Sequence, residues 1–100
     1  MEIRPTDRYL ENLQGERDGA ALYDAVAASE TNPKLAEVYR RLAATERKHA
    51  EVWADKLRSE GIAAPKFRPS PRTRILGWLA RRWGARFVLP SIFALEQADR

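Results

Sequence analysis

Residues 32–61 of this chain read NPKLAEVYRRLAATERKHAEVWADKLRSEG. Asn32 has a side chain that caps helix N-termini, and the ring of Pro33 fixes its φ angle at a helical value. No further proline occurs before Gly61, and glycine is a residue type that commonly ends helices. The stretch therefore predicts one long helix over residues 33–60.

A second helix precedes this one. Pro5 suits the first turn of a helix, where its missing N–H costs nothing, and no other proline occurs before Pro33. We therefore predict a helix from about residue 6 to residue 29. The few residues left between the two helices force them to fold back on each other as an antiparallel hairpin.

The rest of the chain changes character. Three prolines lie close together in residues 61–71, which cannot continue a helix and are predicted to form an extended linker. Ser70 and Pro71 repeat the cap-and-proline start, which predicts a helix over residues 71–84. After one more proline, residues 91–100 favour a last helical piece that looks cut short.

These segments predict an all-α fold, because no alternating strand pattern occurs. We expect an antiparallel helical hairpin at residues 1–62, a proline-rich linker at residues 63–71 and a basic helical segment at residues 72–100.

The composition limits the class of protein. The chain has 100 residues, 44% of them hydrophobic, which is enough for one domain with a modest core. It contains no cysteine, so disulfides, iron–sulfur clusters and thiolate zinc sites are excluded. There is no secretory signal pattern and no run of roughly 18 apolar residues. We therefore expect a soluble cytoplasmic protein, either free or at the inner face of the membrane.

The net charge of +4 is unevenly distributed. Residues 1–65 carry ten Lys or Arg against twelve Asp or Glu, whereas residues 66–95 carry seven Lys or Arg and no acid. Trp78, Trp83 and Phe87 lie among these arginines. The segment has three interpretations: a structural helix with its arginines in solvent, an element that binds a membrane surface, and a nucleic-acid site. Its apolar aromatics favour the membrane over nucleic acid.

Ionisable residues interrupt the apolar stripes of the predicted hairpin. Side chains three or four positions apart share one face of a helix, and we expect the two apolar faces to meet in the core. The first stripe comprises Tyr9, Leu13, Glu16, Ala20, Tyr23 and Ala27, and the second comprises Leu35, Val38, Leu42, Glu46, His49, Trp53 and Leu57. Because a buried carboxylate without a partner is costly, Glu16, Glu46 and His49 predict a compensating cation.

The spacing of these three residues suits a pair of metal ions. Glu46 and His49 lie at i and i+3, so the carboxylate can bridge two metals while the imidazole binds one of them. Ferritin-like di-iron bundles use a Glu-x-x-His pair from each of two helices and one Glu from each of the other two, and Glu16 is the single Glu here. Oxygen ligands with one imidazole per metal favour iron, with manganese as the alternative.

At these residues the chain resembles the ferritin, rubrerythrin and bacterioferritin superfamily, over roughly residues 7–60. The spacing from Glu16 to Tyr23, followed by Glu46 and His49, is similar to the superfamily's first ligand pair with its neighbouring tyrosine. The resemblance implies a hydrogen bond from Tyr23 to a ligand carboxylate or to a metal-bound oxygen. Simple packing in the core is the alternative for a tyrosine on such a stripe.

A further resemblance covers residues 79–96, which are similar to bacterial proteins in which a rubrerythrin-like domain precedes a membrane domain of the vacuolar iron transporter type. By that resemblance Glu96 would be the single Glu of a second ligand pair. However, the sequence has no second Glu-x-x-His. Either the domain is incomplete, or two chains pair their hairpins about a twofold axis and form a four-helix bundle as a homodimer or higher homo-oligomer.

Three functions follow as alternatives. The first is a di-iron centre with ferroxidase-type oxidation of Fe(II), or iron handling linked to transport. The second is a non-catalytic iron-sensing module of a membrane iron transporter. The third is a hairpin that only mediates assembly. The sequence alone leaves open whether the protein is an enzyme.

Overall fold

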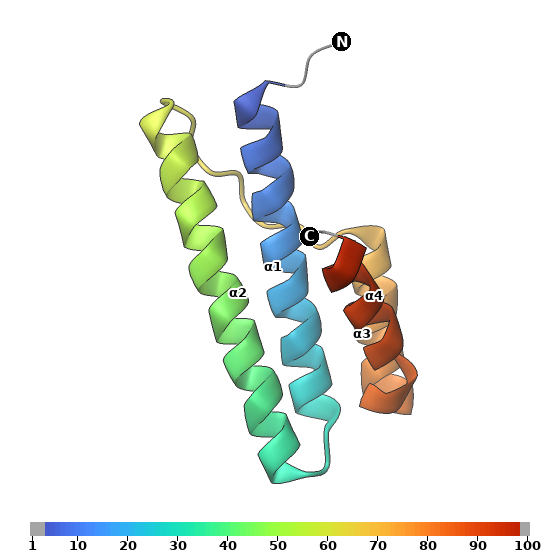
Figure 1. The fold of residues 1–100 in the computed structure, drawn as a ribbon. Helices are drawn as coiled ribbons and strands as arrows, with labels where there is room; N and C mark the ends of the chain where they lie inside the picture. Colours follow the sequence, from blue (N-terminus) through green and yellow to red (C-terminus); the bar gives the residue numbers. More distant parts are fainter. Residues whose placement is uncertain (1–3, 99–100) are drawn as a thin grey trace.

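The computed structural model describes residues 4–98, and the side chains of residues 4–94. Its elements are α1 (Pro5–Ser29), α2 (Pro33–Ser59), α3 (Pro71–Trp83), the short 3-10 helix η1 (Ala85–Phe87) and α4 (Leu89–Ala98). Helices α1 and α2 form a long antiparallel hairpin, and α3 and α4 pack on α1 away from α2 (Figure 1). No strand occurs in this part of the chain. The predicted all-α class and hairpin are confirmed.

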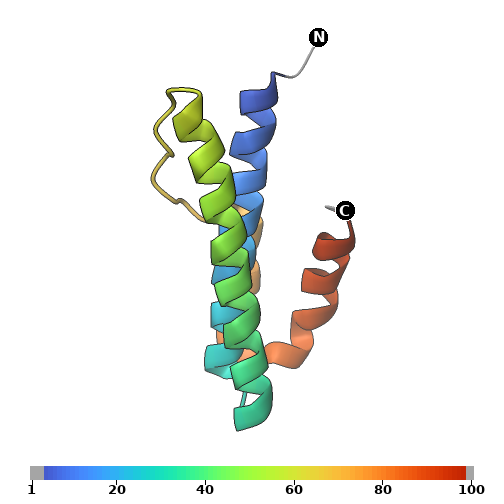
Figure 2. The ribbon, with the colours of Figure 1, turned by 60° about the vertical axis from the view of Figure 1, so that its left-hand side comes forward.

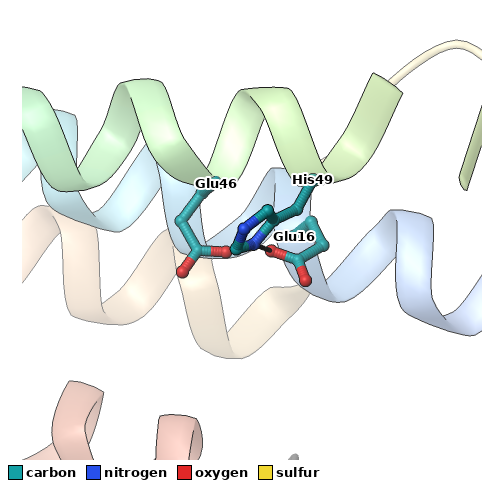
Figure 3. A group of neighbouring side chains, drawn as sticks. All are labelled: Glu16, Glu46 and His49. Atoms are coloured by element: carbon teal, nitrogen blue, oxygen red, sulfur yellow. Dashed lines mark ion pairs between the residues drawn. The ribbon is translucent and has the colours of Figure 1, made fainter. Parts of the chain in front are cut away.

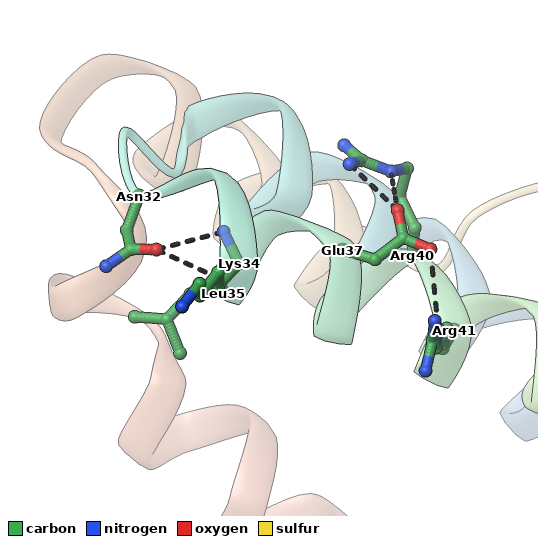
Figure 4. Close-up of polar contacts among 6 residues, drawn as sticks. All are labelled: Asn32, Lys34, Leu35, Glu37, Arg40 and Arg41. Carbon is green, nitrogen blue, oxygen red and sulfur yellow. Dashed lines mark hydrogen bonds and ion pairs between the residues drawn. The ribbon is translucent and has the colours of Figure 1, made fainter.

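Both ends of α2 carry the predicted signals. The side-chain oxygen of Asn32 accepts hydrogen bonds from the backbone N–H groups of Lys34 and Leu35, at 3.0 and 3.3 Å (Figure 4). At the other end Gly61 has a φ of +75°, a value that side chains with a Cβ rarely adopt. This turn lets the N–H of Ile62 donate to a carbonyl in the last turn of the helix.

The first turns of α2 also carry a charged cluster. Glu37 forms ion pairs with Arg40 at 3.0 Å and with Arg41 at 3.4 Å (Figure 4). The Arg40 guanidinium, and to a smaller extent that of Arg41, lowers the pKa of the Glu37 carboxyl below its usual value. All three side chains are exposed, so this cluster contributes little to stability.

The C-terminal helices differ from prediction in one detail. Helix α3 ends at Trp83, where Gly84 with a φ of +99° turns the chain into η1. Helix α4 then begins at Leu89, so Pro90 lies in its first turn. The prediction that Pro90 separates the helices and that the last one starts at Ser91 was therefore wrong. A proline is compatible with the first turn because the N–H it lacks has no partner there.

Alanines form much of the contact between α1 and α2. Small side chains let the two backbones approach closely. They are buried with Leu13 and Leu57, which are 1% and 0% exposed. The buried alanines of the hairpin are Ala20, Ala25, Ala27, Ala36, Ala43, Ala50 and Ala54. A group of buried apolar side chains, including Val26 of α1, Tyr39 of α2, Leu76 and Ile92, joins the hairpin to the C-terminal helices.

The apolar stripe predicted for the core of α2 is only partly buried. Leu35, Val38 and Leu42 are 43%, 48% and 36% exposed, and the side chains that face α1 are the alanines with Tyr39 and Leu57. The prediction that these three residues are core was therefore wrong within one chain. A single neighbouring helix covers only one side of α2, and the alanine side makes the closer contact.

The linker between α2 and α3 is held along α1 by three polar side chains. Gln14 donates to the carbonyl of Arg68 at 2.9 Å, and Arg17 donates to the carbonyl of Pro65 at 2.6 Å. Asp18 accepts from the backbone N–H of Ser70 at 3.1 Å. The linker and α4 lie on opposite sides of the hairpin (Figure 2). No helix of the described residues is long and apolar enough to cross a membrane.

We predict that Asn32→Ala lowers the free energy of unfolding by about 1 kcal/mol, because two backbone N–H groups lose their acceptor. Asn32→Asp keeps an acceptor oxygen and should unfold like the wild type. Urea unfolding followed by far-UV circular dichroism measures both variants. An equal loss in the two variants would contradict the capping role of Asn32.

Candidate metal centre

Three predicted ligands come together on the hairpin. Glu16 lies on α1, and Glu46 and His49 lie on α2. One potential ligand atom from each of them lies within 4.8 Å of the other two. Figure 3 shows the three side chains pointing toward one another. Nδ1 of His49 lies 3.4 Å from Oε2 of Glu16.

The geometry follows from two features of the chain. The i, i+3 spacing puts Glu46 and His49 on one face of α2, one turn apart. The short connection after Ser29 fixes how the antiparallel helices are aligned, and Glu16 consequently lies opposite this pair. An ion pair of 2.8 Å between Asp24 and Arg47 crosses the same two helices.

Glycine 19 gives the Glu46 carboxylate its room, and sequence reasoning missed it. A Cβ placed on Gly19 would lie 3.3 Å from Oε2 of Glu46, closer than such atoms usually approach. Glycine inside a helix is less favourable than alanine by roughly 0.5–1 kcal/mol. Its position one turn after Glu16, in the interior of a predicted helix, was the available signal.

The group is half-open to solvent. The Glu16 side chain is 24% exposed and the His49 side chain is 54% exposed, while Glu46 is partly buried. Two carboxylates and one imidazole are donors that suit iron and manganese. The residues present therefore fit one side of a carboxylate-rich metal site.

The predicted roles of two further residues, Tyr23 and Glu96, stay predictions. Tyr23 is 4% exposed and belongs to the core that joins α1 to the C-terminal helices. Glu96 lies on α4, but its side chain falls outside the part of the chain whose side chains are described, and Asp99 lies beyond the described residues. The role of Glu96 as a ligand stays a prediction.

The described residues contain one group of this kind, with three ligands. Di-iron sites in ferritin-like bundles take about six. The hairpin thus supplies half of that number of ligands.

A comparison with known protein families agrees with this geometry. The family model described as Rubrerythrin matches residues 10–73, which is more than half of the chain and includes all three residues of the group. The chain belongs to the rubrerythrin family. No curated protein and no solved structure gives a significant match to this rubrerythrin-family chain.

We predict that Gly19→Ala weakens metal binding by about tenfold, because the new Cβ displaces the Glu46 carboxylate. Substitution of a residue that positions a metal ligand commonly costs that much affinity. The control is Gly77→Ala on α3, whose Cβ would meet Ala25 at an ordinary 3.9 Å. Both variants gain helix propensity, so only the first should lose affinity for Fe(II) or Mn(II) in anaerobic titration calorimetry. Equal affinities would show that Gly19 does not shape the site.

Proposed function

We propose that this chain binds iron through Glu16, Glu46 and His49 as half of a carboxylate-bridged di-iron centre. The observation that carries the proposal is the convergence of these three side chains from two helices to within 4.8 Å. The rubrerythrin match over the same residues supports it, because domains of this family typically bind iron. Manganese suits the same donors and is the alternative metal.

Each residue has a proposed role. Glu46 would bridge the two metals, because it lies one turn from His49 on the same face of α2 and a carboxylate has two oxygens with which to bind. Glu16 is a terminal ligand, and His49 binds through one ring nitrogen. The ring nitrogen of His49 that binds the metal must be unprotonated.

The reaction that we propose is ferroxidase-type oxidation. Two ferrous ions would each give one electron to dioxygen, which would take up two protons and leave as hydrogen peroxide, and the ferric iron would pass on to storage or transport. The carboxylates of Glu16 and Glu46 favour this direction, because anionic oxygen ligands stabilise Fe(III) over Fe(II). Residual solvent exposure at His49 leaves a path for iron to enter and leave.

The second candidate is an iron-sensing module, including one coupled to a membrane iron transporter, that binds metal without turnover. The observation in its favour is that one hairpin offers only three ligands, a set that can bind reversibly. Oxygen consumption after addition of ferrous iron separates the two: uptake in proportion to iron supports oxidation, and its absence with retained binding supports sensing.

We further propose that a second copy of the chain completes the centre. The exposed Leu35, Val38 and Leu42 continue the same stripe of α2 that carries Glu46 and His49. Pairing two such faces about a twofold axis would bury this apolar surface and double the ligand set to four carboxylates and two imidazoles. Without metal these carboxylates would repel one another, because they carry like charges at close range.

We predict that Glu46→Ala and His49→Ala each abolish high-affinity ferrous binding, because a ligand is lost while the alanine-lined contact of the hairpin is untouched. The control is Glu51→Ala, which removes an exposed carboxylate from the same helix. Iron bound per chain after anaerobic gel filtration gives the stoichiometry, and far-UV circular dichroism checks helical content. Wild-type stoichiometry in either ligand variant would refute the site.

We also predict that ferrous iron and dimerisation strengthen each other, because metal that prefers the dimer must tighten it by the same factor. Anaerobic sedimentation at low protein concentration, with and without iron, measures that factor. Val38→Asp should abolish the shift while leaving all three ligands in place. Ala44→Asp, an exposed site about 120° around α2 from Val38, should retain it.

A monomer that binds two irons would contradict the shared centre. The missing ligands would then come from within the chain, and Glu96 and Asp99 would be the first residues to replace.

A further inference from the structure

The outer surface of α3 and η1 exposes large apolar side chains that the fold does not use. Ile75, Trp78, Trp83 and Phe87 are 60%, 59%, 54% and 69% exposed. The opposite side of α3 is the one that packs on α1, through buried residues such as Leu76. Single exposed apolar residues are ordinary, but four on one short helix and the turn after it form a patch.

Arginines surround this patch, and the same segment has no acidic residue to neutralise their charge. Arg74, Arg81, Arg82 and Arg86 are all exposed, and no Asp or Glu occurs in residues 66–95. Within the described residues none of these four arginines forms an ion pair, in contrast to the hairpin, where arginines pair with Asp24, Glu37 and Asp55.

One contact ties the two kinds of side chain together. The guanidinium carbon of Arg82 lies 4.6 Å from the centre of the Trp83 ring, and Trp83 meets Phe87 edge-on. Because the guanidinium stacks on the ring, the arginine and the tryptophan can lie side by side at a boundary between apolar and aqueous surroundings. We name the exposed apolar residues and arginines of α3 and η1 the arginine–tryptophan surface.

We propose that the arginine–tryptophan surface binds the surface of an anionic lipid bilayer. Tryptophan concentrates at the boundary between lipid and water, and unpaired arginines are attracted to anionic head groups. The aliphatic Ile75 adds apolar area that an acyl region accepts. An amphipathic helix of this composition lies in the plane of the interface, with its apolar side chains inserted.

A nucleic acid is the other polyanion that such a surface could meet, and the side chains fit it less well. A duplex would neutralise the arginines, but it offers no apolar region for Ile75 and Phe87. The bases of a single-stranded nucleic acid could stack on Trp78 and Trp83. Single-stranded DNA is therefore a stricter competitor of the lipid bilayer in a binding test than a duplex.

Lipid binding at this surface leaves the metal centre free. Helix α3 packs on α1, whereas Glu46, His49 and the exposed Leu35, Val38 and Leu42 lie on α2, whose backbone does not come close to that of α3 (Figure 1). The proposal therefore stands independently of iron binding and of dimerisation.

Co-sedimentation of the full chain with vesicles tests the proposal. Vesicles of mixed phosphatidylglycerol and phosphatidylcholine should bind the protein and shift its tryptophan emission to shorter wavelength, and vesicles of phosphatidylcholine alone should bind at least about tenfold more weakly. The double variant Arg81→Glu/Arg82→Glu should lose at least about tenfold in affinity for the anionic vesicles. Trp78→Ser should weaken binding and reduce the emission shift.

The matched control is Arg8→Glu/Lys34→Glu, which changes the net charge equally at exposed positions of the hairpin and should bind like the wild type. All measurements use one ionic strength, because salt weakens the binding of the protein both to anionic vesicles and to DNA. Equal loss in both double variants, no preference for anionic vesicles, or tighter binding to single-stranded or duplex DNA than to the vesicles would overturn the proposal. Far-UV circular dichroism confirms that each variant is folded.

Discussion

The close contact between α1 and α2 is the constraint on which the rest of this structure depends. Alanines let the two backbones approach. Leu13 and Leu57 fill the end of the contact where α1 begins and α2 ends. This contact fixes the alignment of the two helices, which in turn puts Glu16 opposite Glu46 and His49. Because Gly19 keeps the space beside Glu46 open, the same contact that holds the hairpin also shapes the candidate metal centre.

The contact also determines what the chain leaves outside. Since α2 uses its small side chains against α1, its larger ones, Leu35, Val38 and Leu42, face solvent. They continue the face of α2 that carries Glu46 and His49, so exposed apolar side chains and the half-open group lie along one face of this helix. The C-terminal helices cover a different side of α1 and carry the arginine–tryptophan surface, which separates the proposed lipid contact from the proposed contact between copies.

Local signals in the sequence predicted much of this fold. Asn32, Pro33 and Gly61 act within one or two turns of the backbone, so their effect on helix ends could be predicted without knowing the tertiary structure. The gathering of Glu16, Glu46 and His49 could also be predicted, because helical spacing and a short connection determine it. Their function as metal ligands remains a proposal.

The inward side of α2 could not be predicted, since alanines and leucines both recur at helical spacing and only the partner helix decides which set is covered. The start of α4 at Leu89 was missed because a proline can either precede a helix or occupy its first turn.

Anomalous diffraction at the iron absorption edge, from crystals grown anaerobically with ferrous iron, tests the central claim most directly. We expect two iron peaks between the hairpins of two chains, each within bonding distance of carboxylate oxygens from Glu16 and Glu46 and of one His49 nitrogen. Iron bound elsewhere on the chain, or no iron beside Glu46 in crystals that contain the metal, would contradict it.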